Sequence, residues 1–406
     1  MSLELGISAR LKPLLEQVKA FIETEIEPLE GDYFADVSVG DRWTYTDRQT
    51  EIREGLKQKA RAQGLWNFFM TNSDEGPGLT NVEYAYLAEE MGRSHLSAEV
   101  FNCAAPDTGN MEVLHKYGTD AQKKEWLEPL MAGEIRSAFA MTEPDKACSD
   151  ATNVSCTAVL EGDEWVINGE KHYISGAGDP RCKILIVMVK TDPSAAKHQQ
   201  QSQILVPMET AGVEVLRAMQ VFSMDDAPHG HMHMRFDNVR VPKENVILGA
   251  GRGFEISQGR LGPGRIHHCM RSLGMGEKAL ELMCKRSLAR EAFGKPLAKL
   301  GGNFDIIADS RMELDMARLL TLRAAHMMDT ADIKEARVWV SKIKVIAPNV
   351  TEKIIDAAIQ MFGATGVSQD TPLAHMYMGN RTLRLADGPD EVHRMVVARA
   401  ELKQYL

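Results

Sequence analysis

The apolar residues of the first part of the chain recur at the three- and four-residue spacing of amphipathic helices. Two such stripes consist of Leu11, Leu14, Leu15, Val18, Phe21 and Ile22, and of Tyr84, Leu87, Ala88 and Met91. Thr119 is suited to cap a further surface helix that stops at Gly133. Glycine and proline in residues 73–78 predict a loop between helices. We therefore expect an all-α N-terminal domain over residues 1–136.

After residue 136 the pattern changes to short apolar runs separated by turn residues. The predicted strands are 156–160, 164–167, 170–174, 183–189, 203–206, 213–216 and 231–236. Asn168 and Gly169 predict a tight hairpin, because that turn needs positive φ at both central residues. No helices alternate with the strands. We therefore expect an antiparallel β barrel or sandwich over residues 137–246, and not a dinucleotide-binding α/β fold.

Helical spacing returns beyond Pro242. The three stripes are Leu273, Gly276, Leu280, Met283, Cys284 and Leu288; Met312, Met316, Leu319, Leu320 and Met327; and Val345, Val350, Ile354, Ala357 and Ala358. Such long stripes predict four antiparallel helices packed as a bundle over residues 247–406. The expected fold class is α+β, with an N-terminal helical domain, a middle β domain and a C-terminal four-helix bundle.

Composition narrows the classes of protein that this sequence fits. Its 406 residues exceed what one hydrophobic core usually serves, and 44% of them are hydrophobic. The net charge of -10 and the lack of a Lys/Arg block argue against nucleic acid as a partner. The sequence has no apolar run long enough for a membrane span, and the residues after Met1 do not resemble a targeting segment. We expect a cytoplasmic protein.

Cysteine and histidine do not predict a metal site. The six cysteines are scattered without metal-ligand spacing, which argues against both structural zinc and a disulfide framework. His229, His231 and His233 alternate along one strand, with Asp225 and Asp226 nearby. Alternate residues on a strand stand about 6 to 7 Å apart, so the outer two histidines are too far apart to share one ion. We expect no metal.

The segment 381–399 predicts a helix, a sharp stop and a second helix, with Asp387 at the joint. Gly388 is suited to end the first helix, Pro389 to begin the second, and the acidic Asp390 and Glu391 to occupy its first turn. A carboxylate on such a bend is rigidly aimed, as a general base must be. These residues alone are equally compatible with a helix cap or with a partner for an arginine.

Five separated blocks resemble, in this order, motifs of the acyl-CoA dehydrogenase family. The blocks are 139–150, 165–175, 236–242, 290–296 and 360–366, and the resemblance extends over essentially the whole chain. Ala147 and Cys148 stand where the family usually has glycines, Gly301 where a flavin-contacting glutamine is common, and Pro389 where threonine is common. In these departures the chain is similar to a subgroup whose animal members carry this module at the end of longer chains.

The resemblance implies FAD, bound between the β domain and the C-terminal bundle, with a second subunit completing the site. Backbone groups at Met141 and Thr142 would bond the polar edge of the flavin ring, and Arg290 would face the pyrophosphate. The full set of implied cofactor contacts is Phe139, Met141, Thr142, Ser149, Tyr173, Ile174, Ser175, Arg290, Phe293, Gln360, Gly363, Ala364, Pro389 and Glu391. The resemblance implies no metal ion.

The resemblance also implies a reaction, the α,β-dehydrogenation of a saturated acyl-CoA to trans-2-enoyl-CoA in fatty acid β-oxidation. Asp387 would be the general base, because the family's other position for a base corresponds to Gly264, which cannot serve. The implied substrate contacts are Ser149, Arg265 and Gly388. The implied partners are an electron-transfer flavoprotein as acceptor and further copies of the chain, arranged as a dimer of dimers.

Two other functions fit the same motifs. One is a flavin oxidase of this fold, acting on an acyl-CoA or a nitroalkane, and some such enzymes also use aspartate as the base. The other is a non-catalytic binding module, including the DNA-binding kind. The acid retained at Asp387 argues against the second, as does the lack of a basic tail.

Overall fold

The structure is a computed structural model that describes residues 5–73 and 76–406, and only the backbone of residues 260–263. The chain forms two compact units. The helical unit contains the residues up to Pro28, Phe68–Ala98 and Gly262–Leu406, and the β unit contains Leu29–Asn67 and Glu99–Leu261. Helices from the first 136 residues occur in both units. The loop expected at 73–78 includes residues 74 and 75, which lie outside the described residues.

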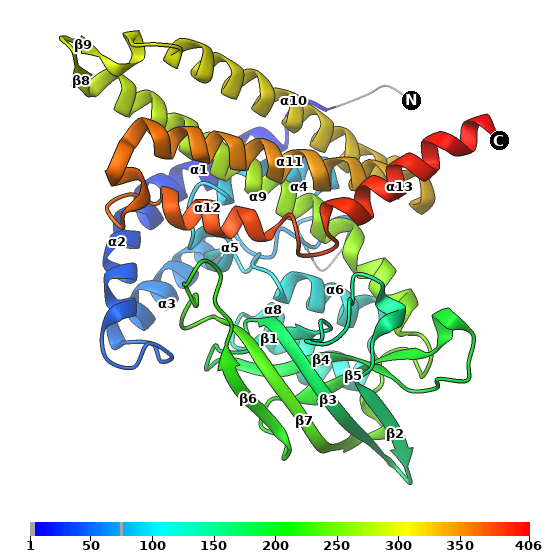
Figure 1. Ribbon diagram of the computed structural model, residues 1–406. Coiled ribbons are helices and arrows are strands. Elements are labelled where there is room, and N and C mark those ends of the chain that lie inside the picture. Colours follow the sequence, from blue (N-terminus) through cyan, green and yellow to red (C-terminus); the bar gives the residue numbers. More distant parts are fainter. Residues whose placement is uncertain (1–4, 74–75) are drawn as a thin grey trace. The chain divides into compact units, whose positions relative to one another are not determined.

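The helical unit is built around three long helices near the C-terminus (Figure 1). They are α9 (Gly253–Ala289, the part from Gly262 on), α10 (Asn303–Thr330) and α11 (Ile333–Phe362). The shorter helices of this unit are α1 (Leu11–Phe21), α4 (Asn81–Met91), α12 (Leu373–Thr382) and α13 (Asp390–Leu402). The hairpin of β8 (Glu291–Ala292) and β9 (Lys295–Pro296) connects α9 to α10. This arrangement agrees with the expected C-terminal bundle.

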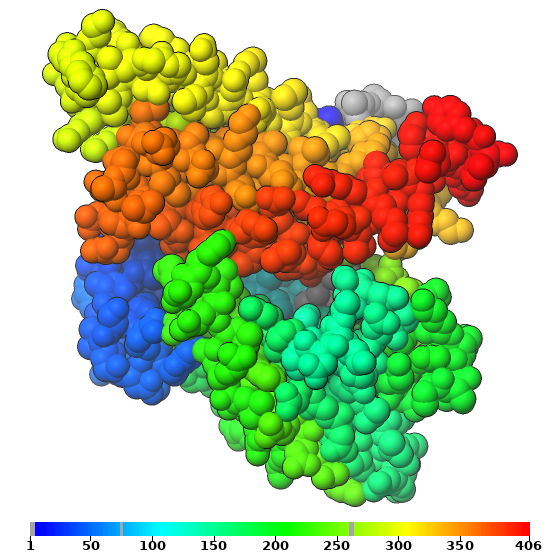
Figure 2. All heavy atoms as spheres, in the orientation of Figure 1, coloured from blue at the N-terminus to red at the C-terminus, as the bar shows by residue number. Residues whose placement is uncertain are grey.

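One predicted core stripe of this unit is wrong for three of its five residues, because Met312, Met316 and Leu319 of α10 are 55%, 63% and 58% exposed. Met327 of the same stripe is buried, as expected. The buried residues of α10 are instead mostly small or branched: Ser310, Leu314, Ala317, Thr321, Leu322, Ala324, Ala325 and Met327. Spacing alone cannot show which of two apolar faces packs inward. The atoms of α10, yellow in Figure 2, lie along the surface of the helical unit.

The β unit contains a seven-stranded sheet in the order β1-β4-β2-β3-β7-β6, with β5 paired to β4. Its strands are β1 (Arg136–Ala140), β2 (Thr157–Glu161), β3 (Glu164–Ser175), β4 (Cys182–Lys190), β5 (Gln201–Pro207), β6 (Val213–Ala218) and β7 (His231–Pro242). Most pairs are antiparallel, but β4 pairs in parallel with β1 and with β2. One face of the sheet covers a core that includes Trp165, Ile167, Val187, Met234 and Phe236.

Helices and short helical turns complete the β unit. They are α2 (Glu27–Ala35, from Leu29 on), α3 (Asp47–Ala62), α6 (Asp107–Tyr117) and the continuous run of α7 (Asp120–Gln122), η3 (Lys123–Leu127) and α8 (Glu128–Met131). Thr119 caps this run as expected, because its side chain accepts a hydrogen bond from the backbone of Gln122. Gly133, with φ of +64°, follows its end.

The hairpin predicted at Asn168–Gly169 is wrong. β3 runs without a turn through both residues, and its register with β7 shifts between Ile167 and Gly169. Gly169 has φ of +146°, and a Cβ there would lie 2.9 Å from the Cα of Cys156, so glycine serves a bulge and a close approach. The actual tight turn joins β2 to β3, where Glu161 pairs with Glu164 across Gly162 and Asp163.

Candidate active site

Asp387 lies on a bend between α12, which ends at Thr382, and α13, which begins at Asp390. Both Asp387 (φ of +55°) and Gly388 (φ of +99°) have left-handed backbones. Pro389 is the residue before the first turn of α13, one position earlier than predicted. The Asp387 side chain is 25% exposed, so it is neither buried in the core nor free in solvent. A non-glycine residue with positive φ on a fixed bend is a common feature of functional sites.

Three side chains, from α9, α11 and α13, hold the carbonyl groups of this bend. Lys344 of α11 donates from Nζ to the carbonyl of Leu383 and to that of Gly388, the latter at 3.4 Å. Arg265 of α9 donates from Nε to the Asp387 carbonyl at 3.0 Å. His393 of α13 donates from Nε2 to the same carbonyl at 3.2 Å. These bonds determine the position of the backbone that carries Asp387.

The sequence analysis missed Lys344 and His393. Lys344 is buried, and burial lowers the pKa of its ammonium group. Burial, followed by the nearby Arg265, also lowers the pKa of His393 to about 4. Its neutral ring can therefore donate through Nε2 to Asp387 while Nδ1 accepts from Ser341 Oγ at 3.2 Å. For Lys344, the signal in the sequence is a lysine that stands within an apolar helical stripe.

The Asp387 carboxylate itself faces His268 of α9, whose Nε2 lies 3.1 Å from Oδ2. On the other side of the ring, Nδ1 lies 3.2 Å from an Arg271 NH2 group. Burial lowers the pKa of His268, although the neighbouring Asp387 acts in the opposite direction. Arg265 and His268 are three residues apart, so one face of α9 contacts both the backbone and the side chain of Asp387.

The two other acids near the bend have different surroundings. Asp390 is 3% exposed, and its Oδ2 accepts from Arg384 Nε and from Asn349 Nδ2, each at 3.0 Å. Glu391 is exposed in the first turn of α13. Asp390 is therefore a structural anchor for Arg384 and α11. Of the three acids, Asp387 alone combines partial exposure with a fixed backbone.

In the β unit, a bulge exposes Tyr173. The register between β3 and β7 shifts between Lys171 and Ile174, and Tyr173 has φ of +55° and is 45% exposed. Ile174 after it is buried. His172, before it, donates its backbone N–H to the carbonyl of Thr142 at 2.9 Å. Bulges commonly re-aim a side chain beside a binding site. This bulge turns the Tyr173 ring outward next to the segment that carries Met141 and Thr142.

A buried ion pair holds the same segment. Lys171 Nζ donates to Glu143 Oε1 at 2.9 Å, to the Met141 carbonyl at 3.0 Å and to the Met188 carbonyl at 2.7 Å. Glu143 also accepts from the backbone N–H groups of Ser155 and Cys156, each at 2.8 Å. Burial by itself would raise the pKa of Glu143, but Lys171 and these donors hold it below its usual range. The backbone at Met141 and Thr142 is thereby fixed.

The three histidines of β7 and its approach each have a different environment. His231 Nδ1 lies 2.8 Å from the Ser175 hydroxyl, and His233 Nε2 lies 2.8 Å from Glu170 Oε2. His229 is held in its neutral form because burial lowers its pKa. The described partners of the three rings therefore differ. Ser175, expected near a cofactor, is thus oriented by His231.

Comparison with known proteins identifies the family. Three family models match the chain: acyl-CoA dehydrogenase N-terminal domain over residues 8–134, middle domain over 138–239 and C-terminal domain over 251–402. The chain belongs to the acyl-CoA dehydrogenase family. It also has the fold of that family, with N-terminal helical, middle β and C-terminal helical parts.

Relatives at about half identity lie in bacteria and animals. "Probable acyl-CoA dehydrogenase FadE2" of Mycobacterium tuberculosis is 54% identical over 354 residues, 87% of this chain and 86% of that protein. A putative acyl-CoA dehydrogenase from Mycobacterium abscessus has a solved structure with a TM-score of 0.96 and 52% identity, covering 99% of this chain and all of that one. Mouse "Acyl-CoA dehydrogenase family member 10" is 52% identical over 98% of this chain, which spans only 37% of that relative.

Five further residues that the family resemblance implies for FAD lie elsewhere in the helical unit. Arg290 and Phe293 belong to the β8–β9 hairpin region, and Gln360, Gly363 and Ala364 end α11. Phe293 is 95% exposed, and Arg290, Gln360 and Ala364 are exposed as well. Gly363 has φ of +66° and open space where a Cβ would project. Figure 1 places this group at the opposite end of α10 and α11 from α13.

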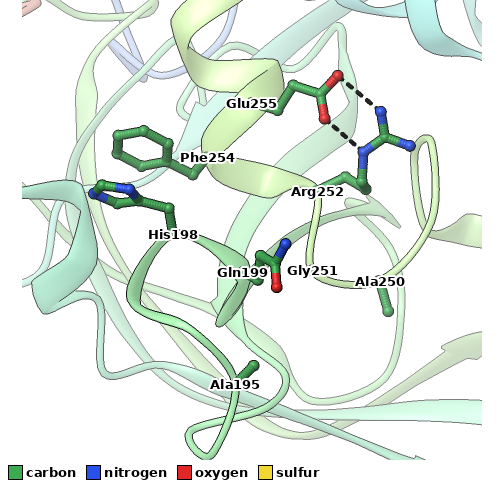
Figure 3. A pocket seen from close by; sticks show the side chains of 8 residues that line it. All are labelled: Ala195, His198, Gln199, Ala250, Gly251, Arg252, Phe254 and Glu255. Carbon is green, nitrogen blue, oxygen red and sulfur yellow. Dashed lines mark hydrogen bonds and ion pairs between the residues drawn. The ribbon is translucent and has the colours of Figure 1, made fainter.

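A separate hollow in the β unit contains none of the expected site residues (Figure 3). Its lining consists of Ala195, His198, Gln199, Ala250, Gly251, Arg252, Phe254 and Glu255. The Arg252 guanidinium is paired with the Glu255 carboxylate, and the His198 ring stacks on Phe254 with centroids 4.3 Å apart. The Arg252 cation in this hollow is therefore already neutralised.

Among the described residues, no helix is both long and apolar enough to cross a bilayer.

Proposed function

We propose that this chain is an FAD-dependent acyl-CoA dehydrogenase that converts a saturated acyl-CoA to its trans-2-enoyl product. The observation that carries the proposal is the Asp387 carboxylate, held on a left-handed bend by Lys344, Arg265 and His393 and partly open to solvent. Family membership supports the reaction class. The role of Asp387 rests on its position in this bend and on its match to the family's catalytic loop.

The α C–H of a thioester is a very weak acid, so the base must be placed accurately and kept ionised. Asp387 takes the α proton onto its carboxylate. The bend contributes accuracy, because three side chains bind its backbone carbonyls before substrate enters. FAD, when bound, supplies the acceptor for the hydride that leaves the β carbon. The proton and the hydride together account for the two hydrogens removed.

The residues present fit a bound flavin. The backbone at Met141 and Thr142, locked by Lys171, presents fixed polar groups, and the Tyr173 ring is already turned outward beside it. Exposed Arg290 and the open backbone at Gly363 are suited to a phosphate and to close approach. We assign the cofactor to the first group together with Phe139, Ser149, Ile174, Ser175, Pro389 and Glu391. We propose that Arg290, Phe293, Gln360, Gly363 and Ala364 reach the cofactor bound by a second copy of the chain.

Substrate contacts are proposed at Ser149, Arg265 and Gly388. Ser149 is exposed on the segment after β1, and Gly388 adjoins the base. Arg265 uses Nε on the Asp387 carbonyl, and a guanidinium has further N–H groups. In this proposal Arg265 both positions the bend and contacts the CoA portion.

Assembly and electron acceptor are proposed from the family. The chain spans about half, or less, of the length of its animal relatives, so partners of those longer proteins need not be its own. We propose an electron-transfer flavoprotein as acceptor and a homo-oligomer, built as a dimer of dimers. The exposed apolar face of α10 and the nearly fully exposed Phe293 support self-association, since such surfaces are costly in water.

Anaerobic mixing with saturated acyl-CoAs of graded chain length tests the proposal. Wild-type protein should carry a yellow flavin that loses its visible absorbance with at least one of them. Asp387→Asn should keep the colour and lose the bleaching, and Glu401→Gln, exposed near the end of α13, is the matched control that should bleach. Bleaching of Asp387→Asn at the wild-type rate would show that the base lies elsewhere. Fast reoxidation by oxygen, compared with a flavoprotein acceptor, would identify an oxidase.

A further inference from the structure

The His268 ring lies between a cation and the candidate base. Its Nε2 faces Asp387 Oδ2 at 3.1 Å, and its Nδ1 faces an Arg271 NH2 group at 3.2 Å. Arg271 and His268 are three residues apart on α9, so both point from the same side of that helix. The three groups form a continuous chain from guanidinium through imidazole to carboxylate.

The guanidinium determines which ring nitrogen carries the proton. An arginine N–H can only donate, so the Nδ1 atom that it faces must accept and cannot itself be protonated. The single proton of the neutral ring therefore lies on Nε2, which faces Asp387 Oδ2. His268 is only partly accessible, with 21% of its side chain exposed, so water cannot easily replace either partner.

We infer that His268 is a positioning residue for the base: it donates Nε2–H to Asp387 Oδ2, and this bond aims Oδ1 at the substrate. The inference rests on the proposed function of Asp387. An aspartate side chain has only two torsions, and the backbone bonds from Arg265, Lys344 and His393 do not determine the second one. A donor on Oδ2 does, because it selects one orientation of the carboxylate plane.

The ring remains a neutral donor because of its surroundings. Burial lowers the pKa of His268, and the cations Arg271 and Lys344 act in the same direction against the opposing Asp387. The titratable and charged groups around the pair are Arg265, His267, Cys269 and Arg271 on α9, Lys344 on α11, and Asp390 and His393 on α13. A neutral donor stabilises the carboxylate through a hydrogen bond. It does not form an ion pair, which would make the carboxylate a much weaker base.

A pair of variants with equal polarity and different reach tests the inference. In His268→Gln the side-chain amide nitrogen can occupy the place of Nε2, whereas in His268→Asn it is too short to do so. With anaerobic flavin bleaching as the assay, His268→Gln should keep a bleaching rate within a few-fold of wild type. His268→Asn should bleach on the order of 10- to 100-fold more slowly at saturating acyl-CoA, with a little-changed saturation constant. His326→Asn on α10 is the control and should behave as wild type.

The pH profile separates positioning from general structural support. Without the donor, Asp387 loses a partner that favours its ionised form, so the acid limb of the bleaching rate should move to higher pH in His268→Asn and remain in place in His268→Gln. Arg271→Met should slow bleaching, because the ring proton is then no longer confined to Nε2, and Arg271→Lys should restore most of the rate. Flavin content and thermal midpoint confirm folding in each case.

The possible outcomes distinguish this inference from the proposed function. If Asp387→Asn abolishes bleaching while His268→Asn keeps the wild-type rate and acid limb, the inference is wrong and the proposed function stands. Equal losses in His268→Gln and His268→Asn would also overturn it, because the amide donor would then make no difference. If Asp387→Asn itself bleaches normally, the assignment of the base fails first.

Discussion

Lys171 Nζ lies 2.9 Å from Glu143 Oε1, with side chains that are 0% and 3% exposed. This pair joins β3 to the segment after β1, because the same ammonium group also binds the carbonyls of Met141 and Met188. A buried charge that loses its partner stays buried without compensation. Replacing one member of the pair should therefore destabilise the protein more than replacing both with apolar residues.

Lys171→Met should therefore lower the free energy of unfolding by about 3 to 5 kcal/mol and reduce flavin content. Lys171→Met combined with Glu143→Leu should recover part of the loss. Lys183→Met is the control, because its pair with Glu209 is exposed (44% and 84%) and is expected to contribute under about 1 kcal/mol. Urea unfolding followed by fluorescence measures each value. A single-variant loss below about 1 kcal/mol would contradict the role given to this pair.

A close crossing of α4 and α9 should depend on glycine at position 274. A Cβ on Gly274 would lie 1.9 Å from the Glu89 carbonyl oxygen and 3.0 Å from the Cα of Gly92. Backbone cannot move aside cheaply, so Gly274→Ala should destabilise the protein by about 1 to 3 kcal/mol. Gly379→Ala in α12 is the matched control: its Cβ meets nothing within 4 Å, and helix propensity predicts a gain of up to about 1 kcal/mol. Thermal unfolding of the two variants should show shifts of opposite sign.

Acid should destabilise the protein partly through His393. Its pKa is about 4 in the folded state, chiefly because of burial, and about 6.5 when unfolded. The stabilising contribution is complete above pH about 6.5 and is lost as pH falls toward about 4, since only the unfolded chain then binds the proton. The loss should reach about 3 kcal/mol, and buried His229 and His267 act in the same direction. Urea midpoints at several pH values should show a shallower slope in His393→Gln.

Lengthening the base should slow the reaction without affecting the fold. Asp387→Glu moves the carboxylate by about 1.5 Å while the bend stays held by its carbonyl bonds. Displacement of this size costs on the order of 100-fold in rate. Stopped-flow bleaching measures the change, and the flavin spectrum and unfolding midpoint should match wild type. An unaltered or faster rate would mean that the substrate, and not the bend, determines the reacting distance.

The exposed face of α10 should control assembly. Met312, Met316 and Leu319 are spaced by four and three residues, so they form one surface. Met316→Lys together with Leu319→Lys should lower the mass measured by sedimentation, because charge opposes burial at an interface. Val159→Lys, at an apolar residue of β2 that is also exposed (57%), is the control and should leave the mass unchanged. A wild-type mass in the double variant would exclude this face from the contact.

Patterns along the chain were sufficient for the broad architecture and for the bend that carries Asp387. Helical spacing, a change to short strands and the Asp387-Gly388-Pro389 turn are local, because each depends on residues within a few positions of one another. The same local patterns gave wrong predictions where one pattern is compatible with two different structures. Asn168–Gly169 forms a bulge and not a hairpin, because pairing with β7 continues through it. The Met312–Leu319 stripe is exposed although its spacing is that of a core.

The partners of Asp387 could not be read from such patterns. Arg265 and His268 lie about 120 positions before it, and Lys344 and His393 belong to two further helices. A local turn determines that a carboxylate is presented, because its backbone angles depend on neighbouring residues. The packing of α9, α11 and α13 determines which groups reach that carboxylate, since hydrogen bonds require atoms about 3 Å apart and only the folded chain brings them there.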